Sequence, residues 1–217
     1  MLICLQAMDT SGKDGIINYV PAAMNPQGCR VAHLRRPYPE EAAHDFLWRA
    51  HRVAPARAEA VIFNRSHYED VLVVHVHQLI AKSVCLARYE RINEFELALA
   101  EDGTVSLKFY LHISSEEQLA RFKERLDDPT KHWKISEADY LERRFWPQYL
   151  RAYEEALSRC STERAPWYVI PANHKWFRNL AVARIVVERL EAMGLKYPEP
   201  TVDLTRIRRE YHAAAAK

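Results

Sequence analysis

The chain has 217 residues, of which 48% are hydrophobic and 28% are charged, a composition typical of a soluble globular protein with one domain. Its net charge of +2 gives no general electrostatic reason to expect nucleic-acid or membrane binding, so an anion-binding site must be a local cluster. Four widely spaced cysteines without a Cys-x-x-Cys pair predict reduced thiols in a cytoplasmic protein, and no apolar run is long enough to cross a bilayer.

The first predicted element is a strand at residues 2–6, which runs into a loop of small residues ending in Gly12-Lys13. A segment that can form a helix, residues 16–20, follows. This order indicates a phosphate-binding loop, in which backbone N–H groups and the lysine ammonium face an anion. Ala7 and Asp14 stand where the usual pattern has Gly and Ser or Thr, and a surface turn remains the alternative. The phosphate-binding residues predicted here are Thr10, Ser11, Gly12, Lys13, Asp14 and Gly15.

Asp9 lies inside the same loop. A bare carboxylate repels phosphate, so its position is favourable only if a cation lies between the two. Mg²⁺ binds in this way, through one or two carboxylates together with phosphate oxygens. The loop therefore predicts Asp9 as a Mg²⁺ ligand.

A second strand is predicted at residues 29–34, and it ends at Arg35. Ligands of open α/β sheets bind at the carboxyl ends of strands, so Arg35 is a candidate phosphate contact. The sequence supports equally well the alternative that Arg35 lies at a solvated strand end and contacts no phosphate. Residues 40–53 are predicted to form one helix.

The third predicted strand, residues 60–63, ends at Asn64, where phosphate-loop enzymes carry an acidic residue for the metal. Asn64 adds no charge, but Glu69 follows closely and could supply it. Ser66 and Glu69 also have the spacing of a capping box that opens a helix over residues 68–77. The sequence leaves the metal and capping roles of Glu69 equally open.

A helix at residues 88–100 and a strand at 104–113 follow, and this strand has the clearest alternation in the chain. Ser114 and Glu117 form a second capping box, which opens a helix through Leu126. Repeated strand–helix units with short connections predict an α/β fold with a parallel sheet between helices.

Residues 121–146 carry a local cluster of basic side chains and join two helices through a polar loop that contains a proline. A third capping signal, Ser136 to Asp139, opens the second helix, which is predicted to continue through Arg151. The arrangement indicates a mobile lid over phosphates. The alternative is a solvated helical hairpin whose charge is neutralised by neighbouring acidic residues. A last strand is predicted at 166–170, followed by a helix that ends at Gly194 and by a basic tail over residues 197–217.

Seven segments, taken together and in order, resemble the second family of polyphosphate kinases. They cover nearly the whole chain and are far more specific than the phosphate loop by itself. Ala7 and Asn64 resemble the residues of the subgroup that phosphorylates both nucleoside mono- and diphosphates. The segments are Gln6–Gly15, Asn25–Gly28, His44–Arg49, Phe63–Val73, Arg125–Pro129, Lys131–Lys134 and Pro166–Arg178.

The resemblance implies a thymidylate-kinase-like phosphate-loop fold, a three-layer αβα domain over residues 1–217 with a helical lid. It also implies that a helical segment of the family is missing before the first strand, and that the chain assembles as a homo-oligomer. The implied reaction is Mg²⁺-dependent phosphoryl transfer between inorganic polyphosphate and AMP, ADP or ATP. The catalytic residues would be Asp9, Lys13, Asn64, Arg65, Arg121 and Arg178, the metal ligands Asp9, Asn64 and Glu69, and the lid phosphate contacts Lys131 and Lys134.

The residue types suit this reaction. A nucleotide phosphate has a second pKa of about 6, so it is already largely an anion and needs little help from a general base. Positioning and charge neutralisation then supply most of the catalysis. Two other functions remain open, an ATP-dependent nucleoside monophosphate kinase and a non-catalytic protein that binds polyphosphate or nucleic acid.

Overall fold

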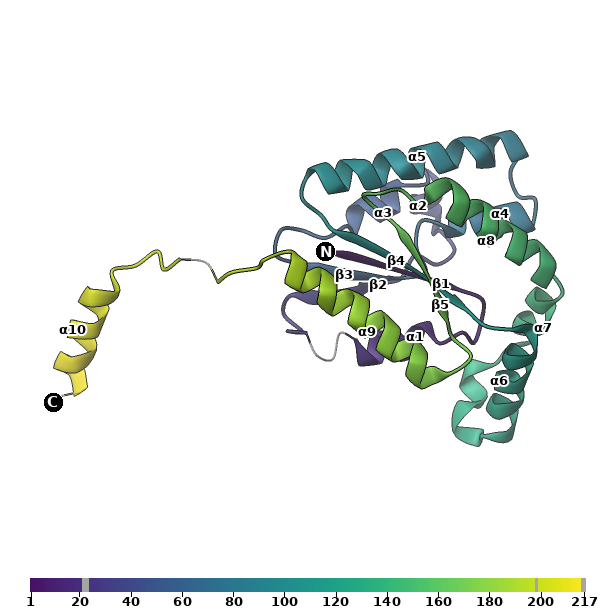
Figure 1. Ribbon diagram of the computed structural model, residues 1–217. Coiled ribbons are helices and arrows are strands. Elements are labelled where there is room, and N and C mark those ends of the chain that lie inside the picture. The colour runs from purple at the N-terminus through teal and green to yellow at the C-terminus, as the bar shows by residue number, and fades with distance from the viewer. Residues whose placement is uncertain (21–23, 198, 216–217) are drawn as a thin grey trace. The chain divides into compact units, whose positions relative to one another are not determined.

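The computed structural model describes residues 1–20, 24–197 and 199–215 (Figure 1). Its described residues form a five-stranded parallel sheet in the order β2-β3-β1-β4-β5. Strand β1 is therefore central, and its carboxyl end lies between those of β3 and β4. The strands are β1 (Leu2–Ala7), β2 (Cys29–Ala32), β3 (Ala60–Asn64), β4 (Ser106–His112) and β5 (Trp167–Pro171).

Helices cover both faces of the sheet, which confirms the predicted α/β fold with three layers (Figure 1). One face carries α4 (Glu69–Val76), α5 (Lys82–Glu101) and α8 (Trp146–Cys160). The opposite face carries α1 (Lys13–Tyr19) and the first part of α9 (Lys175–Ala192). The other helices of the described residues are α2 (Pro39–Ala42), α3 (Trp48–Arg52), α6 (Ser115–Asp127), the 3₁₀ helix η2 (Pro129–Lys134), α7 (Glu137–Arg143) and α10 (Leu204–Ala215).

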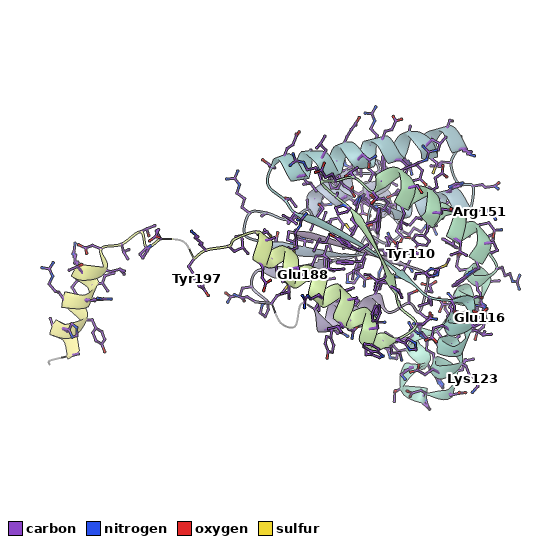
Figure 2. The ribbon with its side chains drawn as sticks, in the orientation of Figure 1. Tyr110, Glu116, Lys123, Arg151, Glu188 and Tyr197 are labelled. Atoms are coloured by element: carbon purple, nitrogen blue, oxygen red, sulfur yellow. The ribbon has the colours of Figure 1, made fainter. Side chains whose placement is uncertain are left out.

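The strands of the sheet contribute buried side chains to a hydrophobic core. Leu2 and Cys4 of β1 pack with the α4, α5 and α8 side, where Tyr110 of β4, labelled in Figure 2, stacks on Tyr153 with ring centroids 4.3 Å apart. Every residue of β1 is buried, as expected for a parallel strand covered on both faces. The buried sheet fixes where its strands end, and therefore where the loops at its carboxyl edge lie.

Two predicted helices are broken in the structure. The helix predicted over 40–53 is wrong, because the Asp45 carboxylate accepts a hydrogen bond from the Leu47 N–H at 3.0 Å and α3 begins anew after it. The helix that was predicted to run from residue 136 through Arg151 also divides, into α7 and α8. Pro147 lies in the first turn of α8, a position that proline favours because it has no N–H to donate there.

The three predicted capping boxes have different outcomes. The box of Ser136 and Asp139 is complete and opens α7. At α6, Ser114 accepts from the Glu117 N–H at 3.2 Å, but the Glu117 carboxylate binds Arg121 instead of returning to the cap. At α4 the predicted box is wrong, because this helix has no side-chain cap and Glu69 faces Arg65.

The chain divides into two compact units, residues 1–184 and residues 185–217. The first unit contains the sheet and the predicted lid. The second includes Gly194, whose positive φ of 58° accompanies the predicted end of α9, and the exposed helix α10. The four cysteines are free thiols, as predicted, and no described helix is long and apolar enough to span a membrane.

Candidate functional site

The predicted phosphate loop lies between β1 and α1, at the carboxyl end of the central strand. Thr10 and Gly12 have positive φ angles of 66° and 97°. Glycine adopts this backbone freely, but for a β-branched residue such as threonine it costs on the order of 1–3 kcal/mol. Strain of this kind at Thr10 is typical of a functional loop.

Two cavities open beside the loop, and both are lined by Asp9, Arg65 and Asp139. We call the larger one, of about 510 Å³, the basic cleft. It is also lined by Thr10, Gly12, Lys13, Asp14, His33, Arg35, Asn64, Arg125, Trp133 and Lys134. We call the smaller one, of about 250 Å³, the aromatic cavity. Its other lining residues include Glu69, Leu72, Val73, Gln118, Trp146, Tyr149 and Tyr153.

Lys13 is held within the loop. Its Nζ donates to the Ala7 carbonyl oxygen at 3.0 Å, and burial lowers its pKa although Asp9 opposes the shift. Two of the residues that depart from the usual pattern of phosphate-loop enzymes contact each other, because Asn64 Nδ2 donates to Asp14 Oδ1 at 3.1 Å. The carboxylate that the tip of β3 lacks is thus supplied from α1.

Arg65 lies between the two predicted metal carboxylates. It is 3.4 Å from Asp9 Oδ1 and 3.6 Å from Glu69 Oε2, and its φ of 61° is also left-handed. Burial lowers the pKa of Arg65, but the charges of Glu69 and Asp9 outweigh it and leave that pKa raised. Burial raises the pKa of Glu69 although Arg65 and Lys13 oppose the shift. A cation beside Glu69 would remove the cost of this buried charge.

Arg121 and Arg178 contact the loop through its carbonyl oxygens. Arg121 Nη1 donates to Thr10 O at 2.8 Å, and Arg178 Nη1 donates to Ser11 O at 3.1 Å. Both residues are buried, with exposed fractions of 6% and 4%. Burial lowers the pKa of Arg178, and Arg121 lowers it further.

The three other basic residues predicted to contact phosphate differ in their surroundings. Arg35 and Lys134 line the basic cleft. Lys131 is paired in the lid with Glu124 at 2.8 Å and Asp128 at 2.9 Å, so a phosphate would have to replace these carboxylates. The predicted phosphate-binding role of Lys131 stays a prediction.

Several site residues were missed by sequence reasoning. Trp146, Tyr149 and Tyr153 line the aromatic cavity from α8, and their 3–4-residue spacing was a usable signal for one helix face. Gln118 is buried and contacts the loop, but a single glutamine in a helix gives no such signal.

The site's carboxylates come from separate segments. Among the described residues, no group of three or more His, Cys, Asp or Glu side chains could hold a metal ion. Asp9 and Glu69, on either side of Arg65, are the candidate ligands. A metal bound to this pair would need further oxygen atoms from a substrate or from water.

Comparison with known proteins identifies similar chains along almost the whole length. The chain is 53% identical over 200 residues to an AMP/ADP-polyphosphate phosphotransferase of Meiothermus ruber, covering 92% of this chain and 75% of the relative. It is 43% identical over 213 residues to an ADP-polyphosphate phosphotransferase of Rhodopseudomonas palustris, covering 93% of this chain and 74% of the relative.

Solved structures give the same result. The crystal structure of polyphosphate kinase 2 from Arthrobacter aurescens TC1 matches with a TM-score of 0.95 and 43% identity, covering 98% of this chain and 75% of that one. A deoxyadenosine kinase from M. mycoides with bound dATP matches with a TM-score of 0.50 and 17% identity, covering 86% of this chain and 100% of that one, which shows a shared fold. Residues 1–198 match the family described as Polyphosphate kinase 2 (PPK2), and the chain therefore belongs to the polyphosphate kinase 2 family, as the sequence motifs implied.

Proposed function

We propose that the protein transfers phosphoryl groups reversibly between inorganic polyphosphate and AMP or ADP. The observation that carries this proposal is the meeting of two unlike cavities at Asp9 and Arg65. A phosphate chain in one and a nucleotide in the other would bring their reacting phosphates together there. The names of the relatives support both substrates.

The basic cleft is the proposed polyphosphate site. Lys13, Arg35 and Lys134 line it together with the backbone of the loop, so that a chain of negative charges meets cations along its length. Loop N–H groups and the lysine ammonium would hold the phosphate that is transferred.

The aromatic cavity is the proposed nucleotide site. Tyr149 and Trp146 offer ring faces and edges for a base, and stacking of this kind tolerates different bases. The Tyr149 hydroxyl donates to Glu142 Oε2 at 2.8 Å, so the ring is held in place from the lid helix α7. A base in this cavity would direct its phosphate toward Arg65.

Mg²⁺ is the proposed metal, and the donor set fits it. Mg²⁺ commonly takes one or two carboxylates together with substrate phosphate oxygens, which matches Asp9 and Glu69 beside a phosphate cleft. When bound, Mg²⁺ would neutralise phosphate charge and favour in-line transfer. Asn64, paired with Asp14, would lie at the edge of this metal site.

The chain's own residues orient the reactants. A nucleotide phosphate oxygen attacks the terminal phosphorus of polyphosphate. The bond between this phosphorus and the oxygen that bridges it to the rest of the chain breaks, and the shortened chain leaves with the negative charge on that oxygen. Arg65 lies where both cavities meet and would contact the transferred group, while Lys13 would stabilise the charge on the leaving chain. Following the family resemblance, the proposal includes ATP as the product of a second transfer, and a cytoplasmic homo-oligomer.

The donor assay tests this function. Purified protein with Mg²⁺, polyphosphate and AMP should form ADP and then ATP, measured by nucleotide chromatography. Phosphorylation of AMP by ATP, without any by polyphosphate, would instead identify a monophosphate kinase. Polyphosphate binding without transfer from either donor would identify a non-catalytic binding protein.

A further inference from the structure

Three consecutive carbonyl oxygens of the phosphate loop accept hydrogen bonds from side chains of distant elements. Gln118 Nε2 donates to Asp9 O at 3.1 Å, Arg121 Nη1 to Thr10 O at 2.8 Å and Arg178 Nη1 to Ser11 O at 3.1 Å. All three side chains are buried. We call these three residues the carbonyl clamp.

Arg121 also ties the loop to the segment after β5. Its Nη2 donates to Ala172 O at 2.6 Å and Asn173 O at 2.9 Å, and its Nε donates to Glu117 at 2.7 Å. Four of its five N–H donors therefore bind protein oxygens. One planar guanidinium group holds three backbone carbonyls in a fixed arrangement, which a lysine ammonium cannot reproduce.

Arg178 lies directly against the loop backbone. A Cβ atom added at Gly12 would lie 1.7 Å from Arg178 Nη1, and one added at Gly15 would lie 2.5 Å from Nη2. The two glycines thus provide the space that the guanidinium group occupies. Gly15 has no positive φ, so this contact is the structural reason for a glycine there.

The clamp determines where the loop N–H groups point. In a planar trans peptide, C=O and the following N–H point in opposite directions. Holding the carbonyls of Asp9 and Ser11 therefore directs the N–H groups of Thr10 and Gly12 away from the clamp. Thr10 and Gly12 both line the basic cleft.

We propose that Gln118, Arg121 and Arg178 are positioning residues that hold the phosphate loop in its anion-binding shape from the carbonyl side. They act without touching phosphate. This inference rests on the proposed function of the loop, and it gives Arg121 and Arg178 a positioning role in place of the catalytic role that the family resemblance implied. The bond from Arg121 to Thr10 O also secures the strained backbone at Thr10.

The clamp connects the loop to the lid. Gln118 and Arg121 lie on α6, and Gln118 Oε1 accepts from Arg143 Nη1 of α7 at 2.8 Å. Arg143 also donates to the Ser115 hydroxyl at 2.8 Å. A movement of α7 would displace Arg143 and, through Gln118, the Asp9 carbonyl.

The test compares Gln118→Met, Arg121→Lys and Arg178→Lys with the wild type and with Arg91→Ala, an exposed arginine paired with Glu94 on α5. Each clamp variant should lower kcat with polyphosphate by on the order of 10²-fold, with little change in KM, because a small misplacement of the loop is enough. In the ligand-free protein, the backbone order parameter of Gly12 should fall from about 0.85 to below about 0.6. Arg91→Ala should leave both quantities unchanged.

Two results would overturn the clamp. The first is that both lysine variants and Gln118→Met keep the wild-type kcat. This result would show that Arg121 and Arg178 act through their positive charge near phosphate and that Gln118 has no role in activity. An unchanged Gly12 order parameter in all three variants would show that the loop keeps its shape without them. A wild type that makes no ADP from polyphosphate would contradict the proposed function instead, and the order parameter would still test the clamp.

Discussion

Glu69 is a carboxylate that the fold buries next to the phosphate loop. Only 15% of its side chain is exposed, and burial raises its pKa even though Arg65 and Lys13 stand nearby. A residue with a raised acid pKa destabilises the folded protein at neutral pH, because the unfolded chain ionises it more easily. Such a cost is tolerated where a bound cation removes it during function.

Glu69→Gln should stabilise the metal-free protein at neutral pH. The sign follows from proton binding: between the ordinary pKa of 4.5 and the raised one, the folded state holds more protons than the unfolded state, so stability falls as pH rises. The variant's advantage should therefore be full above the raised pKa and should shrink as the pH falls toward 4.5. Melting temperatures without divalent metal, measured across this range, check the expectation.

The control for this substitution is Glu94→Gln, at an exposed position on α5, measured over the same pH range. The same Glu69→Gln protein should lose activity in the polyphosphate assay and regain part of it at high Mg²⁺. A variant that is less stable at every pH and fully active would mean that Glu69 has a structural role.

At the scale of elements, the lid offers a matched pair of lysines. Lys131 is paired with Glu124 and Asp128, and Lys123, labelled in Figure 2, is paired with Asp127 on α6. Lys131→Ala and Lys123→Ala each remove one charge from a solvated pair, and such pairs contribute little to stability. Both melting temperatures should stay close to that of the wild type.

The two variants should differ in activity. If Lys131 reaches phosphate when the lid closes, Lys131→Ala should lower kcat by up to on the order of 10²-fold, because a donor to the reacting charge is lost. Lys123→Ala should be silent. Steady-state kinetics with polyphosphate and ADP measure both. Parallel loss of stability and activity in Lys131→Ala would support the solvated hairpin.

Structural features set by neighbouring residues could be predicted from the sequence, and contacts between residues far apart in the sequence could not. The alternation of apolar residues at 104–113 is a local signal and predicted β4, although the polar face of this strand, with Lys108, is buried as well. The helix over 40–53 was mispredicted because one side chain, Asp45, ends the regular pattern. The clamp bonds join residues 109, 111 and 167 positions apart, a separation at which no local pattern carries information.

At the scale of the whole molecule, a buried charged network joins the sheet to three other segments. Lys108 of β4 is fully buried, and its Nζ donates to Glu96 Oε2 of α5 at 2.5 Å, to the Tyr68 hydroxyl at 2.8 Å and to the Cys160 carbonyl at 2.6 Å. His67 Nε2 lies 3.3 Å from Glu96 Oε1. Burial alone would raise the pKa of Glu96, but His67 and Lys108 outweigh it and lower that pKa.

This network reaches the site through the chain itself, because His67 and Tyr68 follow Arg65 by two and three residues. The Tyr68 hydroxyl donates to Glu96 Oε1 at 2.8 Å, which anchors the start of α4 in the core. Gln6 of β1 adds a bond to the Ser66 hydroxyl at 3.1 Å. The segment that presents Arg65 is therefore fixed from behind by buried polar contacts.

Lys108→Met should destabilise the protein by about 3–5 kcal/mol, because it leaves the buried Glu96 carboxylate without the ammonium group that pairs with it. The double variant Lys108→Met, Glu96→Gln removes both charges, and the new amide oxygen can still accept from the Tyr68 hydroxyl, so much of the stability should return.

Urea unfolding at pH 7 measures the free energies of unfolding of the wild type, the two single variants and the double variant, with Arg91→Ala as the exposed-pair control. A double variant that is more stable than the Lys108→Met protein would show that the contributions of Lys108 and Glu96 to the free energy of unfolding depend on each other. A double variant that loses the sum of the two single losses would mean that the charges are stabilised independently, and the network would then not be the anchor of the Arg65 segment.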